Sequence, residues 1–248
     1  MTDPAKEPAP VLVWSKNRRT PRRQAPSVEQ IVHTAIVIAD AEGLSALSMR
    51  RVAADLNSGT ASLYRYVASR DDLLDLMIDT VQGETDPPPL SRDWRTDLTS
   101  VAGHVRATLL RHPWLGPELA GRPALGANSL RQHDVALTAA TALTSDITLA
   151  SKVVDTVLAY VFGAVARELA EDQARRRSGL TEDQWRDSVA PYIRDVIAGG
   201  AYPQFARRVL DAEDATEDER FDFGLACVLD GVAARVRSTA RPTENANS

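Results

Sequence analysis

Residues 48–72, SMRRVAADLNSGTASLYRYVASRDD, decide the fold of this chain. Ser48 is a good N-cap residue, and the polar turn at residues 57–59 interrupts the helical pattern, so the stretch predicts two very short helices in succession. The second helix carries more hydrogen-bonding side chains than a core helix needs: Thr60, Ser62, Tyr64, Arg65 and Tyr66. These residue types indicate that the second helix contacts a polar partner.

Further helices flank this pair. Upstream, Ser27 and Gln30 have capping-box spacing, and apolar residues recur at helical intervals until Gly43 can end the helix. Downstream, Ser69 caps a fourth helix that continues to about residue 83. We expect Leu63 to point inward together with Val67, four residues later, which leaves the polar side chains of the third helix facing outward.

Three prolines, Pro87 to Pro89, mark a break, and the rest of the chain is again helical. Helices are expected at about 92–111 and 129–143, separated by a Gly- and Pro-rich segment. Two longer segments, 153–169 and 221–236, have apolar residues on more than one face and therefore need cover on more than one face. A second copy of the chain can supply that cover in a helical bundle; the alternative is two fully buried helices in a monomer. No alternating strand pattern is present, so the predicted fold class is all-α.

Composition limits the class of protein. With 248 residues, 44% of them hydrophobic, the chain can build a substantial core. Because Cys227 is the single cysteine, the chain cannot form an intrachain disulfide. Since Cys227 lies in an apolar helical segment, we expect it to be a small core residue. We find no apolar run of about 18 residues and no signal-peptide pattern, and expect a cytoplasmic protein without a membrane partner.

Charge is divided unevenly along the chain. The net charge is -5, yet residues 15–70 hold nine Lys or Arg and only four Asp or Glu. Part of this excess lies in a Pro-rich N-terminal arm: Lys16, Arg18, Arg19, Arg22 and Arg23. A cationic arm beside a polar helix is typical of segments that lie along phosphates or enter the minor groove of DNA; the alternative is a solubilising tail.

Enzymatic chemistry finds little support in the sequence. The four histidines lack metal-binding spacings such as HExxH, and no Gly-rich phosphate loop is present. We therefore expect no catalytic residue, no metal and no cofactor. An enzymatic or purely small-molecule-binding body stays open as the less favoured alternative.

The order of motifs resembles a known family. SVEQIVHTAIVIADAEG, SMRRVAADL, the NSGT turn, SLYRYV and SRDDLLDLM together resemble the N-terminal domain of the tetracycline-repressor (TetR) family of bacterial transcription regulators, almost without gaps over residues 27–82. Beyond it, RHPWL at 111–115, AGRP at 120–123 and FDFGLACVLDG at 221–231 resemble the C-terminal domain of tetracycline repressors more loosely.

The resemblance implies an architecture. Residues 1–26 would form a flexible basic arm, and residues 27–83 a three-helix helix-turn-helix DNA-binding domain with a fourth helix that joins it to the body. Residues 84–238 would form a helical ligand-binding and dimerisation domain, followed by a disordered tail at 239–248. The implied partners are a pseudo-palindromic DNA operator, a second copy of the chain and a small-molecule effector.

The resemblance also implies roles for individual residues. Arg50 would grip a guanine edge from the second helix, and the third helix would enter the major groove and place Thr60, Ala61, Ser62, Arg65 and Tyr66 near bases and sugar-phosphate. Contacts to the DNA backbone would come from Ser48, Tyr64 and Arg70.

The implied effector pocket is less defined. Tetracycline repressors hold a drug–magnesium complex with a histidine and a glutamate, and Glu118 and Arg167 stand at the matching places here. The sequence therefore predicts neither tetracycline nor magnesium as the ligand. The residues in range of a ligand cavity in the body are Trp114, Glu118, Arg122, Asn128, His133, Tyr160 and Phe162.

Together these features predict a repressor that a small molecule releases from its operator. A constitutive DNA-binding protein without an effector is the second hypothesis.

Overall fold

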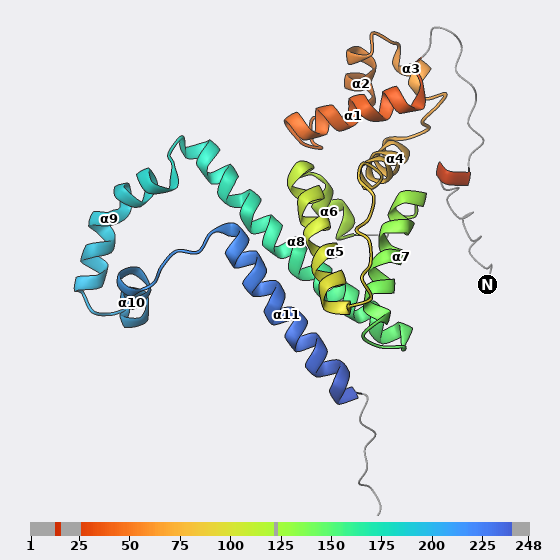
Figure 1. Ribbon diagram of the computed structural model, residues 1–248. Coiled ribbons are helices and arrows are strands. Elements are labelled where there is room, and N and C mark those ends of the chain that lie inside the picture. The colour runs from red at the N-terminus through yellow and green to blue at the C-terminus, as the bar shows by residue number, and fades with distance from the viewer. Residues whose placement is uncertain (1–12, 16–25, 122–123, 240–248) are drawn as a thin grey trace, which may run out of the picture. The chain divides into compact units, whose positions relative to one another are not determined.

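The computed structural model describes residues 13–15, 26–121 and 124–239 (Figure 1). Within these ranges the secondary structure is eleven α-helices and one short 3-10 helix, η1 (Val13–Ser15), with no strand. The prediction of an all-α fold is confirmed. The cations of the predicted arm, Lys16 to Arg23, and the predicted tail from residue 240 onward lie outside the described residues. The chain divides into two compact units. The first ends at Val154, and the second begins at Asp155.

Four helices open the first unit: α1 (Val28–Glu42), α2 (Met49–Asp55), α3 (Thr60–Leu63) and α4 (Arg70–Gln82). The predicted N-caps are confirmed, because Ser27, Ser48 and Ser69 each accept a hydrogen bond from the backbone N–H three residues later. Ser27 and Gln30 complete a capping box, and Gly43 ends α1. We call α1 to α3 the head.

The third helix is shorter than its sequence suggests. After Leu63 the backbone makes hydrogen bonds between residues three apart, from Arg65 to Ser62 and from Tyr66 to Leu63, and one between residues four apart, from Val67 to Leu63. The bonds between residues three apart are typical of the tighter turns that end α-helices. The helix is held from one side by two fully buried residues, since Leu63 and Val67 are both 0% exposed. The prediction that they point inward is confirmed.

Three further helices follow in the first unit: α5 (Trp94–Arg111), α6 (Leu115–Leu119) and α7 (Ala127–Thr141). α7 packs against both α4 and α5, so the helix that leaves the head is continuous with the core of the unit. A Gly- and Pro-rich segment was expected where α6 forms, and this one-turn helix is an addition to the sequence-based expectation. Pro113 follows α5 as predicted.

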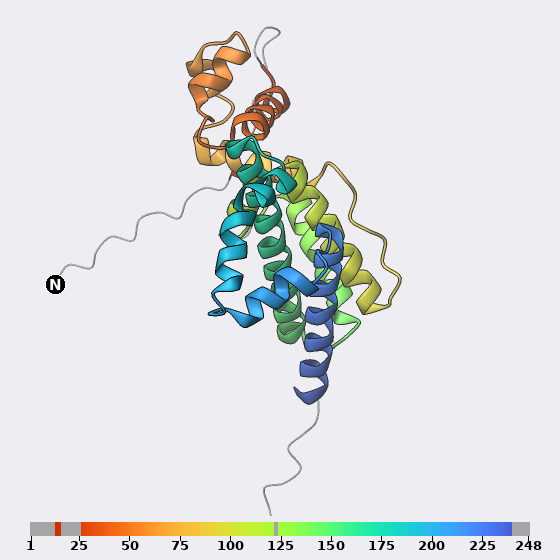
Figure 2. The ribbon, with the colours of Figure 1, turned by 90° about the vertical axis from the view of Figure 1, so that its left-hand side faces the viewer.

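Four helices make up the rest of the chain: α8 (Ile147–Ser178), which begins in the first unit, α9 (Glu182–Ala198), α10 (Pro203–Asp211) and α11 (Glu217–Thr239). α8 and α11 lie side by side and antiparallel (Figures 1 and 2), because Tyr160 contacts Phe221 and Arg167 contacts Glu217. By composition alone α8 could cross a bilayer, a criterion that core helices of globular proteins also meet. Its buried valines include Val157, Val161 and Val165.

Contact between α8 and α11 is close at one glycine. The hydroxyl of Tyr160 donates to the backbone oxygen of Phe221 at 2.7 Å. A Cβ added to Gly224 would lie 2.3 Å from that hydroxyl, so a larger residue would push the ring away. Glycine at this position therefore lets the two helices approach each other.

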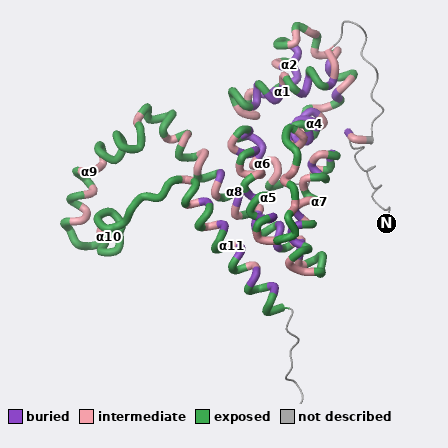
Figure 3. The backbone as a smooth tube through the Cα atoms, in the orientation of Figure 1, coloured by how far each residue is buried: buried purple, intermediate pink, exposed green. Residues whose placement is uncertain are grey.

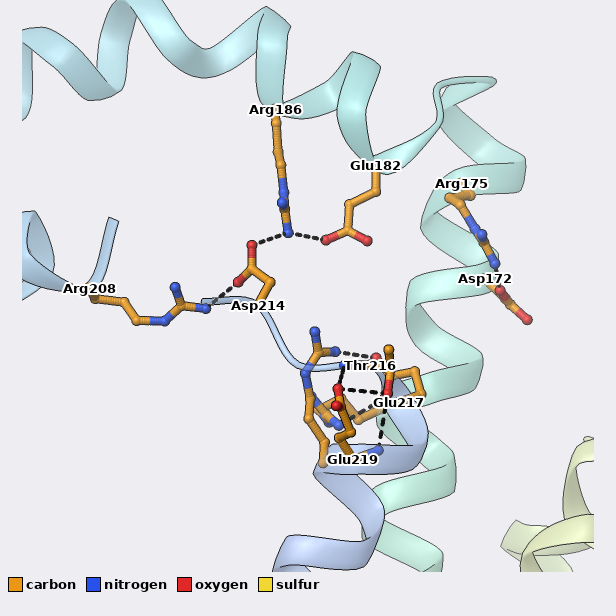
Figure 4. A network of polar contacts seen from close by, with 11 residues as sticks. Asp172, Arg175, Glu182, Arg186, Arg208, Asp214, Thr216, Glu217 and Glu219 are labelled. Atoms are coloured by element: carbon orange, nitrogen blue, oxygen red, sulfur yellow. Dashed lines mark hydrogen bonds and ion pairs between the residues drawn. The ribbon is translucent and has the colours of Figure 1, made fainter. Parts of the chain in front are cut away.

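α9 and α10 contain no buried residue and were not expected from the sequence (Figure 3). Polar contacts connect them to the loop that precedes α11 (Figure 4). Asp214 accepts from Arg186 of α9 at 2.8 Å and from Arg208 of α10 at 2.5 Å. All three side chains are more than one third exposed, so these ion pairs orient the helices with little net stabilisation.

One face of α11 is buried and the other is exposed. The buried residues recur every three or four positions: Phe221, Leu225, Leu229, Ala233 and Val236. On the opposite face Phe223 is 74% exposed, and Cys227, one turn later, is exposed as well. The prediction that Cys227 is a core residue was wrong, because the buried stripe passes through its neighbours Leu225 and Leu229 and leaves Cys227 on the other side.

Candidate nucleic-acid interface

The α2–turn–α3 segment presents a polar surface held from behind by apolar residues. Ala61, Tyr64 and Arg65 are exposed, and Thr60, Ser62 and Tyr66 are partly exposed. The guanidinium of Arg65 donates to Ser62 Oγ at 2.9 Å, which holds its long side chain along the helix. This bond restricts the conformations of one exposed cationic side chain on the surface.

Arg50 and Arg51 have opposite surroundings although they are neighbours on α2. Arg50 is exposed. The guanidinium of Arg51 lies 2.8 Å from Glu42 of α1 and 3.2 Å from Asp55 of α2. The hydrogen bond with Glu42, followed by that with Asp55, raises the pKa of Arg51 above its ordinary value. Of this pair, Arg50 is therefore the arginine whose charge is not used in an ion pair within the head.

Two of the residues predicted to contact the DNA backbone also have internal roles. Ser48 Oγ accepts from the backbone N–H of Arg51 at 3.1 Å, as an N-cap. Arg70 donates to the backbone oxygens of Leu44 at 3.1 Å and Leu47 at 3.5 Å. Arg70 thus holds the α1–α2 loop, and its charge remains exposed at the surface.

A buried histidine links the head to the rest of the first unit. The side chain of His112, directly after α5, is 4% exposed. Its Nδ1 lies 2.8 Å from Asp40 Oδ1 on α1, and its Nε2 lies 3.0 Å from Glu84 Oε2, just beyond α4. The indole N–H of Trp114 donates to the same Asp40 oxygen at 2.7 Å. We call Asp40, Glu84, His112 and Trp114 the His112 clasp.

A second joint fixes α4 against α7. Asp79 of α4 is 9% exposed, and its Oδ1 accepts from the backbone N–H groups of Asn128 and Ser129, each at 2.9 Å. The N-cap residue of α7 is Gly126, which has no side chain to offer. Asp79 therefore caps the N-terminus of α7 from another helix, where the helix dipole also favours a carboxylate.

Several residues predicted to line an effector pocket already serve internal contacts. Trp114 bonds to Asp40, Asn128 to Asp79 and Tyr160 to the backbone of α11. Glu118 and Phe162 are partly buried, His133 is exposed, and Arg122 lies outside the described residues. Arg167, the other position compared with tetracycline repressors, pairs with Glu217 at 2.9 Å. The pocket assignment stays a prediction.

Sequence reasoning did not predict the contacts of Asp79 or of the His112 clasp, although the sequence around Asp79 contains an indication of its contact. Asp79 lies among the buried residues Met77, Ile78 and Val81 of α4. An acidic residue inside an apolar stripe requires a partner, and that requirement is visible in the sequence. For His112, the three segments that meet around it are far apart in the chain, and no local pattern brings Asp40 and Glu84 to it.

The structure also has a surface hollow that the sequence did not suggest. It has a volume of about 470 Å³ and lies at the end of α8 and the start of α9. Arg175, Leu180 and Trp185 are among the residues that line it. The described members of the predicted pocket set lie elsewhere in the chain.

Comparison with known proteins identifies the family. Residues 87–236 match the family model described as "Tetracyclin repressor-like, C-terminal domain". The HTH-type transcriptional repressor DrrR1 of Streptomyces coeruleorubidus is 39% identical over 230 residues, which cover 91% of this chain and 84% of the relative. The chain belongs to the TetR family.

Solved structures of TetR proteins agree with this assignment. Apo ActR from Streptomyces coelicolor superposes with a TM-score of 0.72 at 28% identity, over 87% of this chain and 98% of ActR. The complex of ActR with actinorhodin gives a TM-score of 0.69 at 30% identity, over 86% of this chain and 99% of ActR. As a TetR-family member, the chain is a helix-turn-helix transcriptional regulator that binds DNA.

Proposed function

We propose that this protein is a homodimeric repressor that binds a pseudo-palindromic operator and leaves it when a small molecule binds the body. The observation that carries the proposal is the surface of α2 and α3, where Arg50 and Arg65 are exposed above the buried Leu63 and Val67. In this proposal α3 enters the major groove and Arg50 reads a guanine. Thr60, Ala61, Ser62 and Tyr66 complete the base-facing surface, and Ser48, Tyr64 and Arg70 contact the DNA backbone.

The proposed domain organisation follows from this function. Residues 27–83 act as the DNA-binding domain, and residues 84–238 bind the effector and form the dimer. The likeness to ActR, which binds actinorhodin, supports a small organic effector. No enzymatic step is needed in this function, and the site of action is the bacterial cytoplasm, where the DNA is.

The exposed face of α11 supports a homodimer. Beside Phe223 and Cys227 this face carries small residues, Ala226, Gly231 and Ala234, all of them exposed in the single chain. Small residues let two helices approach closely, and a second copy would bury the phenyl ring. The alternative of two long helices fully buried in a monomer does not fit an α11 whose Phe223 is 74% exposed.

Selection of duplexes from a randomised DNA library tests the DNA-binding half of the proposal. The wild-type protein should select a pseudo-palindrome whose half-sites are about one helical turn apart. The double variant Arg50→Ala, Tyr66→Ala should lose specific binding to that duplex and keep its fold. Selection of no preferred sequence by the wild-type protein would contradict the proposal.

Release by a small molecule separates the repressor from a constitutive DNA-binding protein. Actinorhodin and a panel of other aromatic natural products would be titrated into the complex of the protein with the selected duplex. We expect at least one compound to lower DNA affinity, because an effector shifts the population toward a geometry that no longer fits the operator. Unchanged affinity across the panel would favour constitutive binding.

A further inference from the structure

The His112 clasp brings three segments of the first unit together at one imidazole. α1 contributes Asp40, the chain just after α4 contributes Glu84, and His112 follows α5. Arg111, the last residue of α5, also faces Glu84, with Nη1 at 3.3 Å from Oε2. The indole N–H of Trp114 faces Asp40 at 2.7 Å. These are the charged and polar groups that the described structure places around the ring.

The two carboxylates can both accept hydrogen bonds from a charged imidazole ring but not from a neutral one. A neutral imidazole has one N–H and one lone pair, so it can donate to Asp40 or to Glu84 but not to both. The other nitrogen would then direct its lone pair at a carboxylate oxygen. Both contacts, at 2.8 and 3.0 Å, are hydrogen bonds together only when the ring carries both protons.

We propose that His112 is a positioning residue for DNA recognition and that the strength of DNA binding depends on its protonation. With both ring nitrogens protonated, His112 fixes α1 of the head to the α4–α5 connection. Loss of one proton at higher pH opens one side of the clasp and lets the head move relative to α5.

A looser head weakens specific binding for a geometric reason. A dimeric helix-turn-helix protein must present two recognition helices at a spacing that matches the major groove. A head that is free to reorient loses conformational freedom when it binds, and that loss lowers affinity. The proposal does not depend on an effector, and it uses the DNA-binding activity that the family assignment provides.

The test measures the Kd for the duplex selected by the wild-type protein between about pH 5.5 and 8.5 at constant ionic strength. For the wild-type protein we expect affinity to fall about fivefold or more as the pH rises through this range, a change within the range of typical coupling between sites. The matched control is His33→Gln, which removes an exposed histidine from α1 of the same head. Its pH profile should follow that of the wild-type protein.

Two variants distinguish positioning from a merely structural role. In Glu84→Gln, the side-chain amide can donate to a neutral imidazole, so the clasp closes without the second proton. The DNA affinity of this variant at high pH should equal or exceed that of the wild-type protein and should not change with pH. His112→Asn can donate to Asp40 only, so its affinity should be low and independent of pH. A wild-type slope in either variant would overturn the proposal.

A direct measurement on the ring covers the case in which a variant folds poorly. In 15N NMR spectra of the wild-type protein, the His112 ring should show two N–H groups at the acidic end of the range and one at the basic end. A single N–H throughout would overturn the inference. Failure of the wild-type protein to select any duplex would instead count against the proposed function, and the NMR result would still decide the state of His112.

Discussion

At the scale of single residues, Arg50 and Arg51 show how one position along α2 changes what an arginine does. Arg51 bonds to Glu42 and Asp55, whereas Arg50 is exposed beside α3. Arg50→Ala should lower affinity for the selected duplex by about 5- to 150-fold for each half-site, since a bidentate contact to guanine contributes about 1 to 3 kcal/mol. Fluorescence anisotropy with duplexes that carry single base changes should show lost preference at one base pair in each half-site.

Arg51→Ala is the matched comparison for that measurement. Because its guanidinium is already bound within the head, its removal should lower thermal stability slightly and leave the base preference intact. If both variants lost preference at the same base pair, the assignment of base reading to Arg50 would be wrong.

At the scale of helices, Gly126 tests the joint between α4 and α7. A Cβ at this position would lie 2.1 Å from Asp79 Oδ1, although the backbone φ of -70° suits any residue. Gly126→Ala should therefore destabilise the protein by about 1 to 3 kcal/mol, as overpacking does. Gly103→Ala, at an exposed site in α5 with open space around it, should stabilise by about 0.5 to 1 kcal/mol. Chemical denaturation measures both, and equal effects would contradict the close contact.

The stability of the start of α5 should depend on pH, because a buried carboxylate forms hydrogen bonds there. Asp97 accepts hydrogen bonds from Ser91 Oγ and Ser91 N, both at 2.7 Å, and from Arg92 N at 3.0 Å. Chiefly through the hydroxyl of Ser91, these bonds lower the pKa of Asp97 below its ordinary value. A lowered pKa means that the stabilisation is present above the ordinary pKa of about 4 and is lost as the pH falls through the folded value.

Asp97→Asn isolates this contribution. The variant should be less stable than the wild-type protein at pH 7, and the difference should shrink as the pH falls below about 4. Thermal unfolding followed by circular dichroism over that range measures it. A difference that stays constant with pH would show that the charge of Asp97 does not contribute.

Sequence patterns predicted the helices whose apolar residues face a core. They did not predict the exposed helices or the contacts between residues far apart in the chain. The caps at Ser27, Ser48 and Ser69 are local, so their spacing was sufficient. α9 carries apolar residues at helical spacing, Trp185, Val189 and Ile193, yet it buries none of them, and the sequence analysis assigned no helix here. The contacts of Asp79 and His112 join residues at least 28 positions apart, and only the folded chain brings them together.

At the scale of the whole molecule, the exposed face of α11 predicts the oligomeric state. Phe223→Glu places a charge where the proposal puts a second subunit, and should convert the dimer to a monomer with much weaker operator affinity. Leu210→Glu on α10, at a side chain 69% exposed, is the control and should remain dimeric. Analytical ultracentrifugation distinguishes the two, and a dimeric Phe223→Glu protein would move the interface elsewhere.

We expect the basic arm to contribute to DNA binding through its charge. Deletion of residues 1–24 removes the cations Lys16 to Arg23 and should weaken binding while it flattens the dependence of log Kd on log salt concentration, because fewer counterions are released. Titrations at several salt concentrations measure the slope. An unchanged slope would leave the arm as a solubilising tail.

The cap that Asp79 provides has a practical consequence for dividing the chain into fragments. α7 belongs to the proposed effector domain, yet the carboxylate that accepts from its first free N–H groups comes from α4, before residue 84. A fragment that began at residue 84 would lose this carboxylate and leave the N-terminus of α7 uncapped. An isolated effector-binding fragment should therefore begin at about Ser69 and include all of α4.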